Sequence, residues 1–143
     1  MKILIQKFGG TSVSTHEKRL NVVQKIANAK KLGYYPVVVV SAMGRKGQPY
    51  STDTLLSLIT EDFKDKNLLA VDLLMSCGEV ISCIVMSNEL NNQNIASVPL
   101  TGGQAGIITD DNYSNASVIS TECDNIIRIL KEDKVPIVAG FQG

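Results

Sequence analysis

Four consecutive valines, Val37 to Val40, set the strongest limit on how this chain can fold. Valine is branched at Cβ and favours extended backbone, and an unbroken apolar run places apolar side chains on both faces of a strand. Strands covered on both faces occur mainly in parallel sheets flanked by helices. Pro36 precedes the run, at a strand start where a missing N–H donor is tolerated. The run therefore predicts an α/β domain with a mainly parallel sheet.

A glycine turn follows the first predicted strand, residues 3–5, and precedes an amphipathic segment. Gly9 and Gly10 let the backbone turn sharply and let an anion approach its N–H groups. The N-terminus of the next helix attracts the same charge. Lys7 adds a positive charge beside this turn. An ordinary strand-to-helix turn explains the pattern equally well, because neither GxxxxGK(S/T) nor GxGxxG occurs in the chain.

The first half of the chain alternates between helical and extended patterns, as expected for this fold class. Ser14 and Glu17 form a capping-box pattern in front of a helix that is expected to end at Gly33. Residues 41–52 form a polar loop that leaves the carboxyl end of the valine strand. Loops in this position hold the ligand sites of many α/β proteins.

The middle of the chain is predicted to be helical. Thr52 or Asp53 is expected to cap a short helix, and residues 61–67 form a charged connector. Ser76 and Glu79 form a second capping pattern, which divides the apolar sequence around it into two helices. Those two predicted helices are residues 68–75 and residues 80–90.

The last part of the chain returns to strands. We expect strands at residues 95–100, 116–119 and 135–139, and a helix over residues 121–133. Residues 101–106 form a second glycine-rich loop, directly after the first of these strands.

Composition excludes several classes of function. The formal net charge is zero, aromatic residues make up 5% of the chain, and no basic cluster occurs, so nucleic acid and anionic membranes are poor partners. We find no signal peptide, and no apolar run that approaches membrane-spanning length. Cys77, Cys83 and Cys123 are odd in number and lack CxxC spacing. They are interpreted as reduced, mostly buried thiols of a cytoplasmic protein.

Six blocks of sequence occur in order along the whole chain. They are Lys7-Phe8-Gly9-Gly10-Thr11-Ser12-Val13, Val38-Val39-Val40-Ser41-Ala42-Met43, Ser51-Thr52-Asp53-Thr54-Leu55-Leu56, Ser76-Cys77-Gly78-Glu79, Thr101-Gly102-Gly103-Gln104-Ala105-Gly106 and Gly140-Phe141-Gln142-Gly143. Together these blocks resemble the aspartokinases of the amino acid kinase family. The resemblance implies a three-layer α/β/α sandwich with a mainly parallel sheet. It also implies ATP-dependent phosphorylation of the β-carboxylate of L-aspartate to 4-phospho-L-aspartate, the first step toward lysine, threonine and methionine.

The resemblance implies a phosphate site at the glycine turn. Lys7 would contact the transferring phosphoryl group and serve as the catalytic cation. Gly9 and Gly10 would cradle the phosphates of ATP, with Thr11 and Ser12 beside them.

The resemblance also implies an aspartate site. Ser41 would lie near both aspartate and phosphate, Thr52 would help to hold aspartate, and Glu79 would pair with its α-ammonium. Gln104 and Phe141 are candidates for lining the same pocket. From spacing alone, Glu79 and Thr52 fit helix caps better, and Ser41 fits a strand-end hydroxyl.

This chemistry needs no general base, because a carboxylate with a pKa near 4 is already the nucleophile. It needs in-line positioning and neutralisation of phosphoryl charge, which lysine, backbone N–H groups and Mg²⁺ supply. Mg²⁺ would be held mostly through phosphate, so Asp110 and Asp111 are interpreted as a turn. His16 is interpreted as a solvated residue. Arg45 and Lys46 are interpreted as solvated loop charges, with a loop that closes over ATP as the alternative.

The chain stops directly after its last predicted strand, where a loop would reach the ligand site. We therefore expect residues 1–143 to be the N-terminal portion of an amino acid kinase catalytic domain, without the family's regulatory ACT domain. This portion is not expected to turn over substrate unaided. Members of the family continue with an arginine-glycine-glycine-serine-aspartate segment, whose arginine grips the aspartate α-carboxylate.

Two other functions stay open at this point. One is a non-catalytic fragment that binds aspartate or phosphate, and the other is a sibling kinase for glutamate, carbamate or a nucleotide. The block from Ser76 to Glu79 favours aspartate. The expected ligands are therefore L-aspartate and ATP, and the expected assembly is a homo-oligomer.

Overall fold

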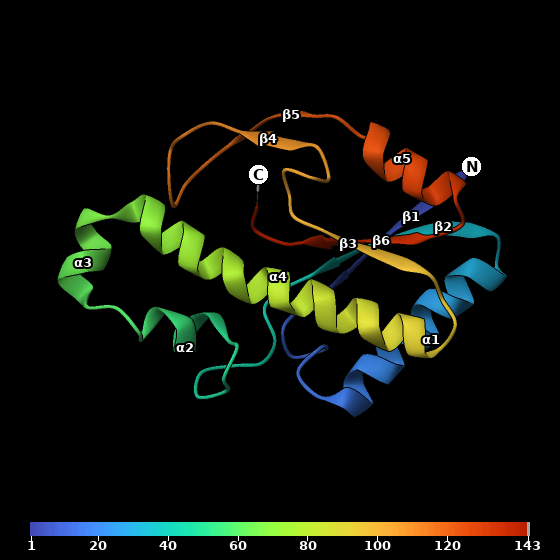
Figure 1. Ribbon diagram of the computed structural model, residues 1–143, viewed down its shortest axis with the longest axis horizontal. Coiled ribbons are helices and arrows are strands. Elements are labelled where there is room, and N and C mark those ends of the chain that lie inside the picture. Colours follow the sequence, from blue (N-terminus) through green and yellow to red (C-terminus); the bar gives the residue numbers. More distant parts are fainter. Residues whose placement is uncertain (143) are drawn as a thin grey trace.

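The computed structural model describes residues 1–142, so Gly143 of the last sequence block lies outside the described residues. Helices and strands alternate along most of the chain, as expected (Figure 1). In chain order the elements are β1 (Lys2–Phe8), α1 (His16–Lys31), β2 (Tyr34–Val40), α2 (Thr52–Leu56), α3 (Glu61–Lys66), α4 (Leu68–Asn92), β3 (Ser97–Leu100), β4 (Ile107–Thr109), β5 (Val118–Thr121), α5 (Asp124–Lys131) and β6 (Val135–Ala139).

Four strands form a parallel sheet in the order β1-β2-β6-β3. The valine strand lies between β1 and β6, and it is apolar on both faces because its side chains pack into an apolar cluster on each side of the sheet. Pro36 is the third residue of β2 and pairs in register with Leu4, whereas β6 pairs with β2 only from Val38 onward. Proline lacks an N–H donor, and at Pro36 this donor is missing where β2 pairs with β1 alone. Strands β4 and β5 form a separate antiparallel pair.

Helices cover both faces of the parallel sheet (Figure 1). Helices α1 and α4 pack on one face, where Ile26 and Met86 meet Val38 in one apolar cluster. Helix α5 covers the other face, where Ile129 meets Val37 in a second cluster. The β4–β5 pair lies on the same side as α5. The expected three-layer α/β/α architecture with a mainly parallel sheet is thus confirmed.

The N-terminus of α1 differs by one residue from the expected cap. Thr15 is the N-cap and its hydroxyl accepts from the Lys18 N–H at 3.3 Å, whereas Ser14 donates to the Thr11 carbonyl. The expectation of a Ser14–Glu17 capping box was therefore wrong, because the Ser14 hydroxyl bonds to the Thr11 carbonyl of the glycine turn instead. Gly33 follows the helix with φ of +81°, so its expected role as the stop residue is confirmed.

The long helix α4 corrects two expectations. Residues 68–92 form one continuous helix, and the Ser76 hydroxyl donates to the Leu73 carbonyl within it, so no helix begins at Ser76. By length and composition alone, α4 is also long and apolar enough to cross a membrane, contrary to the expectation that no such run exists. Its contacts with β3, β6 and α1 place one side of it in the core of the domain.

The cysteines also differ from expectation. Cys83 is buried, but Cys77 and Cys123 are exposed, so the expectation of mostly buried thiols was wrong.

The segment before α4 also differs from expectation. Residues 61–66 form helix α3, capped by the Thr60 hydroxyl, where the sequence suggested a charged connector. Ion pairs from Lys64 to Glu61 and from Lys66 to Asp62 support this short helix. Opposite charges three or four residues apart stabilise a solvent-exposed helix, so helix α3 forms in spite of its polar composition.

A buried carboxylate ties α4 to α1 and to the glycine turn. Glu89 is 3% exposed, and its Oε1 lies 2.9 Å from both Arg19 Nε and His16 Nδ1. Arg19 Nη1 also donates to the Val13 carbonyl at 3.0 Å. Burial acts to raise the pKa of Glu89, but the hydrogen bonds and charges of His16 and Arg19 lower it below its ordinary value. His16 is exposed, as expected, but it is a partner in this cluster.

We predict that Glu89→Ala lowers the free energy of unfolding at pH 7 by about 3 kcal/mol, because it leaves the Arg19 guanidinium unpaired. The lowered pKa means that this stabilisation is present above the ordinary value of 4.5 and is lost as the pH falls through the folded-state value. Urea unfolding from neutral to acid pH measures both effects. Glu132→Ala, at an exposed carboxylate paired with Arg128 and Lys134, is the control and should cost much less. Equal losses in the two variants would contradict the assignment.

Candidate functional site

The carboxyl ends of the four parallel strands meet at one edge of the sheet, and four loops start there. They are the glycine turn after β1, residues 41–51 after β2, residues 101–106 after β3 and residues 140–142 after β6. Because β1 pairs with β2, and β2 with β6, the loops that follow these strands are neighbours. Ligands of open α/β sheets bind at this edge.

The glycine turn is joined to the loop after β2 by backbone hydrogen bonds. Ser41 N–H donates to the Phe8 carbonyl at 3.1 Å, and Gly44 N–H donates to the Gly10 carbonyl at 3.0 Å. A Cβ added at Gly10 would lie only 2.3 Å from the Ala42 carbonyl oxygen. Glycine is therefore required at position 10 because the two loops lie so close together. The sequence suggested a different reason, the approach of an anion to the backbone.

A pocket of about 510 Å³ lies between this loop pair, α2 and α4. It brings together five of the residues expected to form the site, from five separate segments of the chain. They are Gly10, Ser41, Thr52, Glu79 and Phe141.

Glu79 is the buried acid of this pocket. It is 5% exposed, and its Oε2 has no hydrogen-bond partner among the described residues. Burial raises the pKa of Glu79, while the Ala42 backbone amide and the charge of Lys7 oppose that shift. Because α4 is continuous, Glu79 lies inside a helix and is not the capping residue that spacing alone favoured.

Two glycines let other segments approach Glu79. A Cβ added at Gly78 would lie 2.9 Å from Leu55 Cδ1 and 3.1 Å from Ala42 Cβ, so this glycine lets α4 pack closely on α2 and on the loop after β2. A Cβ added at Gly140 would lie 3.4 Å from Glu79 Oε2. The end of β6 therefore also borders the Glu79 carboxylate.

Lys7 lies near the end of β1 and is exposed. It does not line the pocket, but its charge is close enough to influence the pKa of Glu79. None of the ion pairs in the described part of the chain includes Lys7. It therefore offers an uncompensated positive charge beside the glycine turn.

The other expected residues occupy different positions. Gly9, Thr11 and Ser12 belong to the glycine turn but do not line the pocket. Gln104 is bound within its own loop, where its Oε1 accepts from the Thr101 N–H at 3.0 Å, and it does not line the pocket either. Phe141 is 87% exposed at the pocket, with φ of +56°.

Thr52 is the first residue of α2, while Ser51 is the cap, with its hydroxyl accepting from the Thr54 N–H. The expectation that Thr52 or Asp53 caps this helix was therefore wrong, and the side chain of Thr52 is not committed to a cap. Ser51 and Asp53 also line the pocket, although neither was expected to be a site residue. A Ser-Thr-Asp-Thr run offers several possible caps, so sequence alone does not choose among them.

Two further contacts at the site could not be predicted from the sequence. Arg45 Nε donates to Thr11 Oγ1 at 3.2 Å, which places this cation at the glycine turn. Gln142 joins the second glycine loop to α4, because its Oε1 accepts from the Gly102 N–H and its Nε2 donates to the Ser76 carbonyl. Both contacts join residues far apart in the chain, so no local pattern could have signalled them.

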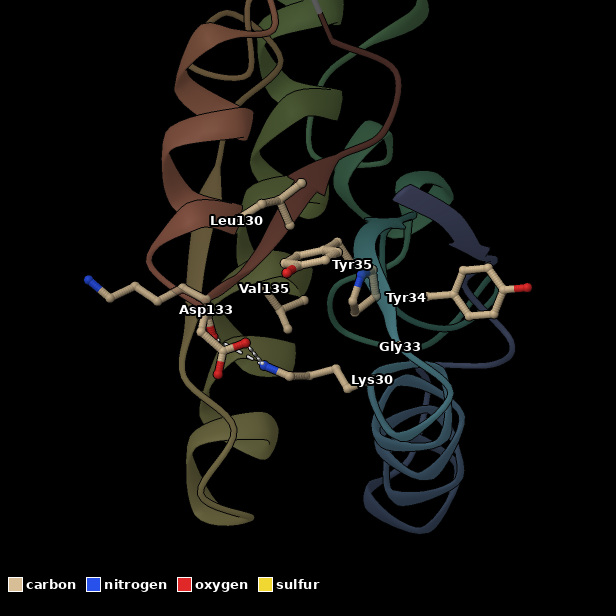
Figure 2. Close-up of a pocket in the computed structure, with 9 residues that line it drawn as sticks. Lys30, Gly33, Tyr34, Tyr35, Leu130, Asp133 and Val135 are labelled. Carbon is tan, nitrogen blue, oxygen red and sulfur yellow. Dashed lines mark hydrogen bonds and ion pairs between the residues drawn. The ribbon is translucent and has the colours of Figure 1, made fainter. Parts of the chain in front are cut away.

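The second pocket, about 170 Å³, lies at the opposite edge of the sheet, where β2 and β6 begin (Figure 2). Lys30 lines it, but its Nζ lies 2.7 Å from Asp133 Oδ1 (Figure 2). Lys134 is likewise paired, with Glu132. Because carboxylates already neutralise both cations, this pocket offers little to an anion, and the chemistry-bearing residues gather at the first pocket.

We predict that Gly10→Ala lowers the free energy of unfolding by about 1–3 kcal/mol, because its methyl group would overlap the Ala42 carbonyl and separate the two loops. Gly9→Ala is the matched control, because a Cβ at Gly9 meets no atom within 4 Å. Urea unfolding of both variants measures the difference. A Gly10→Ala protein as stable as the Gly9→Ala protein would show that the loop contact is not required.

The chain resembles known proteins over nearly all of its length. The family model described as "Amino acid kinase family" matches residues 2–143. Aspartokinase 1 of Bacillus subtilis is 45% identical over 143 residues, which are 100% of this chain and 35% of that protein. The chain spans about a third of the length of the curated relatives it matches.

Solved structures agree with this match. The aspartate kinase from Synechocystis has a TM-score of 0.73 at 35% identity, over 98% of this chain and 22% of that chain. E. coli aspartokinase III, solved in complex with aspartate and ADP, has a TM-score of 0.67 at 15% identity, over 96% of this chain and 40% of that chain. The second likeness shows the fold alone. From the family match over residues 2–143, we conclude that the chain belongs to the amino acid kinase family.

Proposed function

We propose that the protein transfers the γ-phosphoryl group of ATP to the β-carboxylate of L-aspartate. The observation that carries this proposal is Glu79, a buried carboxylate with an unpartnered oxygen in the pocket at the carboxyl edge of the sheet. The relatives named aspartokinase support the same substrate. In this proposal residues 1–143 are the N-terminal portion of a catalytic domain, in a cytoplasmic homo-oligomer.

The α-ammonium of aspartate is the group that Glu79 lacks. A buried carboxylate without a partner is costly, and a ligand cation that donates to Oε2 would relieve that cost. Ser41 and Thr52 line the same pocket and supply hydroxyl groups for the rest of the substrate. Phe141 lines the pocket with an exposed aromatic side chain. Gln104 would have to give up its bond to Thr101 to take part.

The phosphates of ATP would lie at the glycine turn. Lys7 supplies a full charge there, and the N–H groups of Gly9 and Gly10, with the hydroxyls of Thr11 and Ser12, supply further donors. Ser41 lies between this turn and the aspartate pocket, because its N–H is bonded to the Phe8 carbonyl.

The reaction requires little from the protein beyond position and charge. An oxygen of the β-carboxylate forms a bond to the γ-phosphorus while the bond from that phosphorus to the β,γ-bridging oxygen breaks, and ADP leaves with the electron pair. The carboxylate is ionised at neutral pH, so no proton has to be removed. Lys7 would stabilise the negative charge of the transferring group and reduce its repulsion from the carboxylate.

Magnesium would enter as part of the nucleotide substrate. Within residues 1–142, no group of three or more His, Cys, Asp or Glu side chains is arranged to hold a metal ion. Asp53 is a carboxylate at the edge of the pocket, and alone it suits a metal that keeps most of its ligands from phosphate and water. The donor set therefore fits MgATP better than a resident metal.

We predict that Lys7→Ala, in the protein at its natural length, lowers kcat by about 100- to 1,000-fold while KM for aspartate stays nearly constant. The reason is that Lys7 acts on the phosphoryl group and not on aspartate. Lys2→Ala, at the other end of the same strand, is the control. Trapping of the acyl phosphate with hydroxylamine, with aspartate and with glutamate as acceptors, measures the rate and the acceptor. A near-normal kcat for Lys7→Ala would refute the assigned role.

We predict that Glu79→Gln raises KM for aspartate by about 100-fold, the usual scale for breaking a buried charge pair. The same variant should be more stable than the native protein at neutral pH. Burial raises the folded-state pKa of Glu79, so stability falls as the pH rises through that value, and glutamine removes this loss. Kinetics and urea unfolding, with the exposed Glu122→Gln as control, separate the two effects. Unchanged KM with lowered stability would indicate a purely structural glutamate.

A further inference from the structure

We propose that Arg45 is a second phosphate-binding cation of this site, which contacts the terminal phosphates of the nucleotide together with Lys7. This inference rests on the proposed function and adds a residue to it. Sequence alone favoured a solvated loop charge at Arg45, with a loop that closes over ATP as the alternative. The structure instead joins its side chain to the glycine turn, through the 3.2 Å hydrogen bond from Nε to Thr11 Oγ1.

The loop after β2 fixes the backbone at Arg45. Gly44 takes φ of +88° and donates its N–H to the Gly10 carbonyl, so the residue before Arg45 is bound to the glycine turn. The side chain of Gln48 accepts from the Arg45 N–H at 2.8 Å, and the Gln48 N–H donates to the Arg45 carbonyl at 2.9 Å. Both polar backbone groups of Arg45 are therefore held, and its side chain starts from a defined position.

The guanidinium of Arg45 has no acidic partner in the described part of the chain. Arg19 pairs with Glu89 and Arg128 pairs with Glu132, whereas none of the ion pairs in residues 1–142 includes Arg45. A guanidinium carries five N–H donors, and one of them is used on Thr11. The others stay available at the border of the pocket, which Arg45 lines.

Free donors in a planar fork suit phosphate oxygens, which arginine binds through two parallel hydrogen bonds. Thr11 belongs to the turn that is proposed to hold the phosphates, so an anion at that turn lies within reach of the guanidinium. The contact would place positive charge on the side of the phosphates that faces the loop after β2, while Lys7 approaches from β1. One cation near the end of β1 and one in the loop after β2 can neutralise a polyphosphate without neutralising the substrate carboxylate.

Lys46 provides a matched comparison. It is the next residue, carries the same charge, lines the same pocket and is also exposed. No hydrogen bond or ion pair of its side chain occurs in the described residues. If only the summed charge of the loop matters, then loss of either cation should have the same effect. If the contact of Arg45 with the glycine turn matters, then only the loss of Arg45 should weaken phosphate binding.

The test compares Arg45→Met, Arg45→Lys and Lys46→Met in the protein at its natural length. Calorimetric titration with inorganic tripolyphosphate and with MgATP measures phosphate affinity, and kinetics measure KM for each substrate. We expect Arg45→Met to weaken the binding of both anions by at least about 10-fold. Lys46→Met should change the two affinities by less than about twofold, and Arg45→Lys should lose less affinity than Arg45→Met. KM for ATP should rise while KM for aspartate stays nearly constant. Thermal unfolding checks that each variant is folded.

The possible outcomes separate this inference from the proposed function. Native affinity in Arg45→Met, or an equal loss in Lys46→Met, would overturn the role of Arg45 alone. Failure of the native protein to bind either anion would overturn the phosphate site and, with it, both proposals. If the anions bind as expected but no acyl phosphate forms from aspartate, the role of Arg45 stands as a nucleotide contact and the proposed reaction is wrong.

Discussion

The buried carboxylate of Glu79 is the constraint on which the account of this site depends. A carboxylate with an unpartnered oxygen is unfavourable in a protein interior. Here it occurs in the pocket at the carboxyl ends of the strands. The Ala42 amide and the charge of Lys7 offset part of that cost and no more, since the pKa of Glu79 stays raised. A ligand that brings a cation to Oε2 would complete the arrangement in the proposed function.

The surrounding structure serves to hold this carboxylate next to the glycine turn. Gly78 lets α4 approach the loop after β2, and Gly10 lets that loop approach the turn after β1. On the other side of the turn, Arg19 binds the Val13 carbonyl and Glu89, so the turn is also tied to α4. Helix α4 thus carries both Glu79, which lines the pocket, and Glu89, which binds Arg19 and so anchors the turn. The spacing of these two residues along α4 therefore helps to set the position of the turn relative to the pocket.

Much of this could be predicted from the sequence, because it depends on local patterns. The valine run predicted a strand covered on both faces, and the paired glycines predicted the turn that borders the candidate pocket. The failures have a physical cause. Ser76 and Glu79 match a capping box, but inside a helix the serine hydroxyl binds the carbonyl of Leu73, so the same letters occur in an uninterrupted helix. The contact of Arg45 with Thr11 joins two loops, and no local pattern reports it.

The most direct test of the central claim is the number of protons exchanged when aspartate binds. Calorimetric titration with L-aspartate, in buffers of different ionisation enthalpy at a series of pH values above the ordinary pKa of 4.5, gives this number. An ammonium at Oε2 should lower the raised pKa of Glu79, so binding should release protons, and Glu79→Gln should abolish the release. Binding of aspartate with no proton release at any of these pH values, or with the same release from Glu79→Gln, would contradict the account.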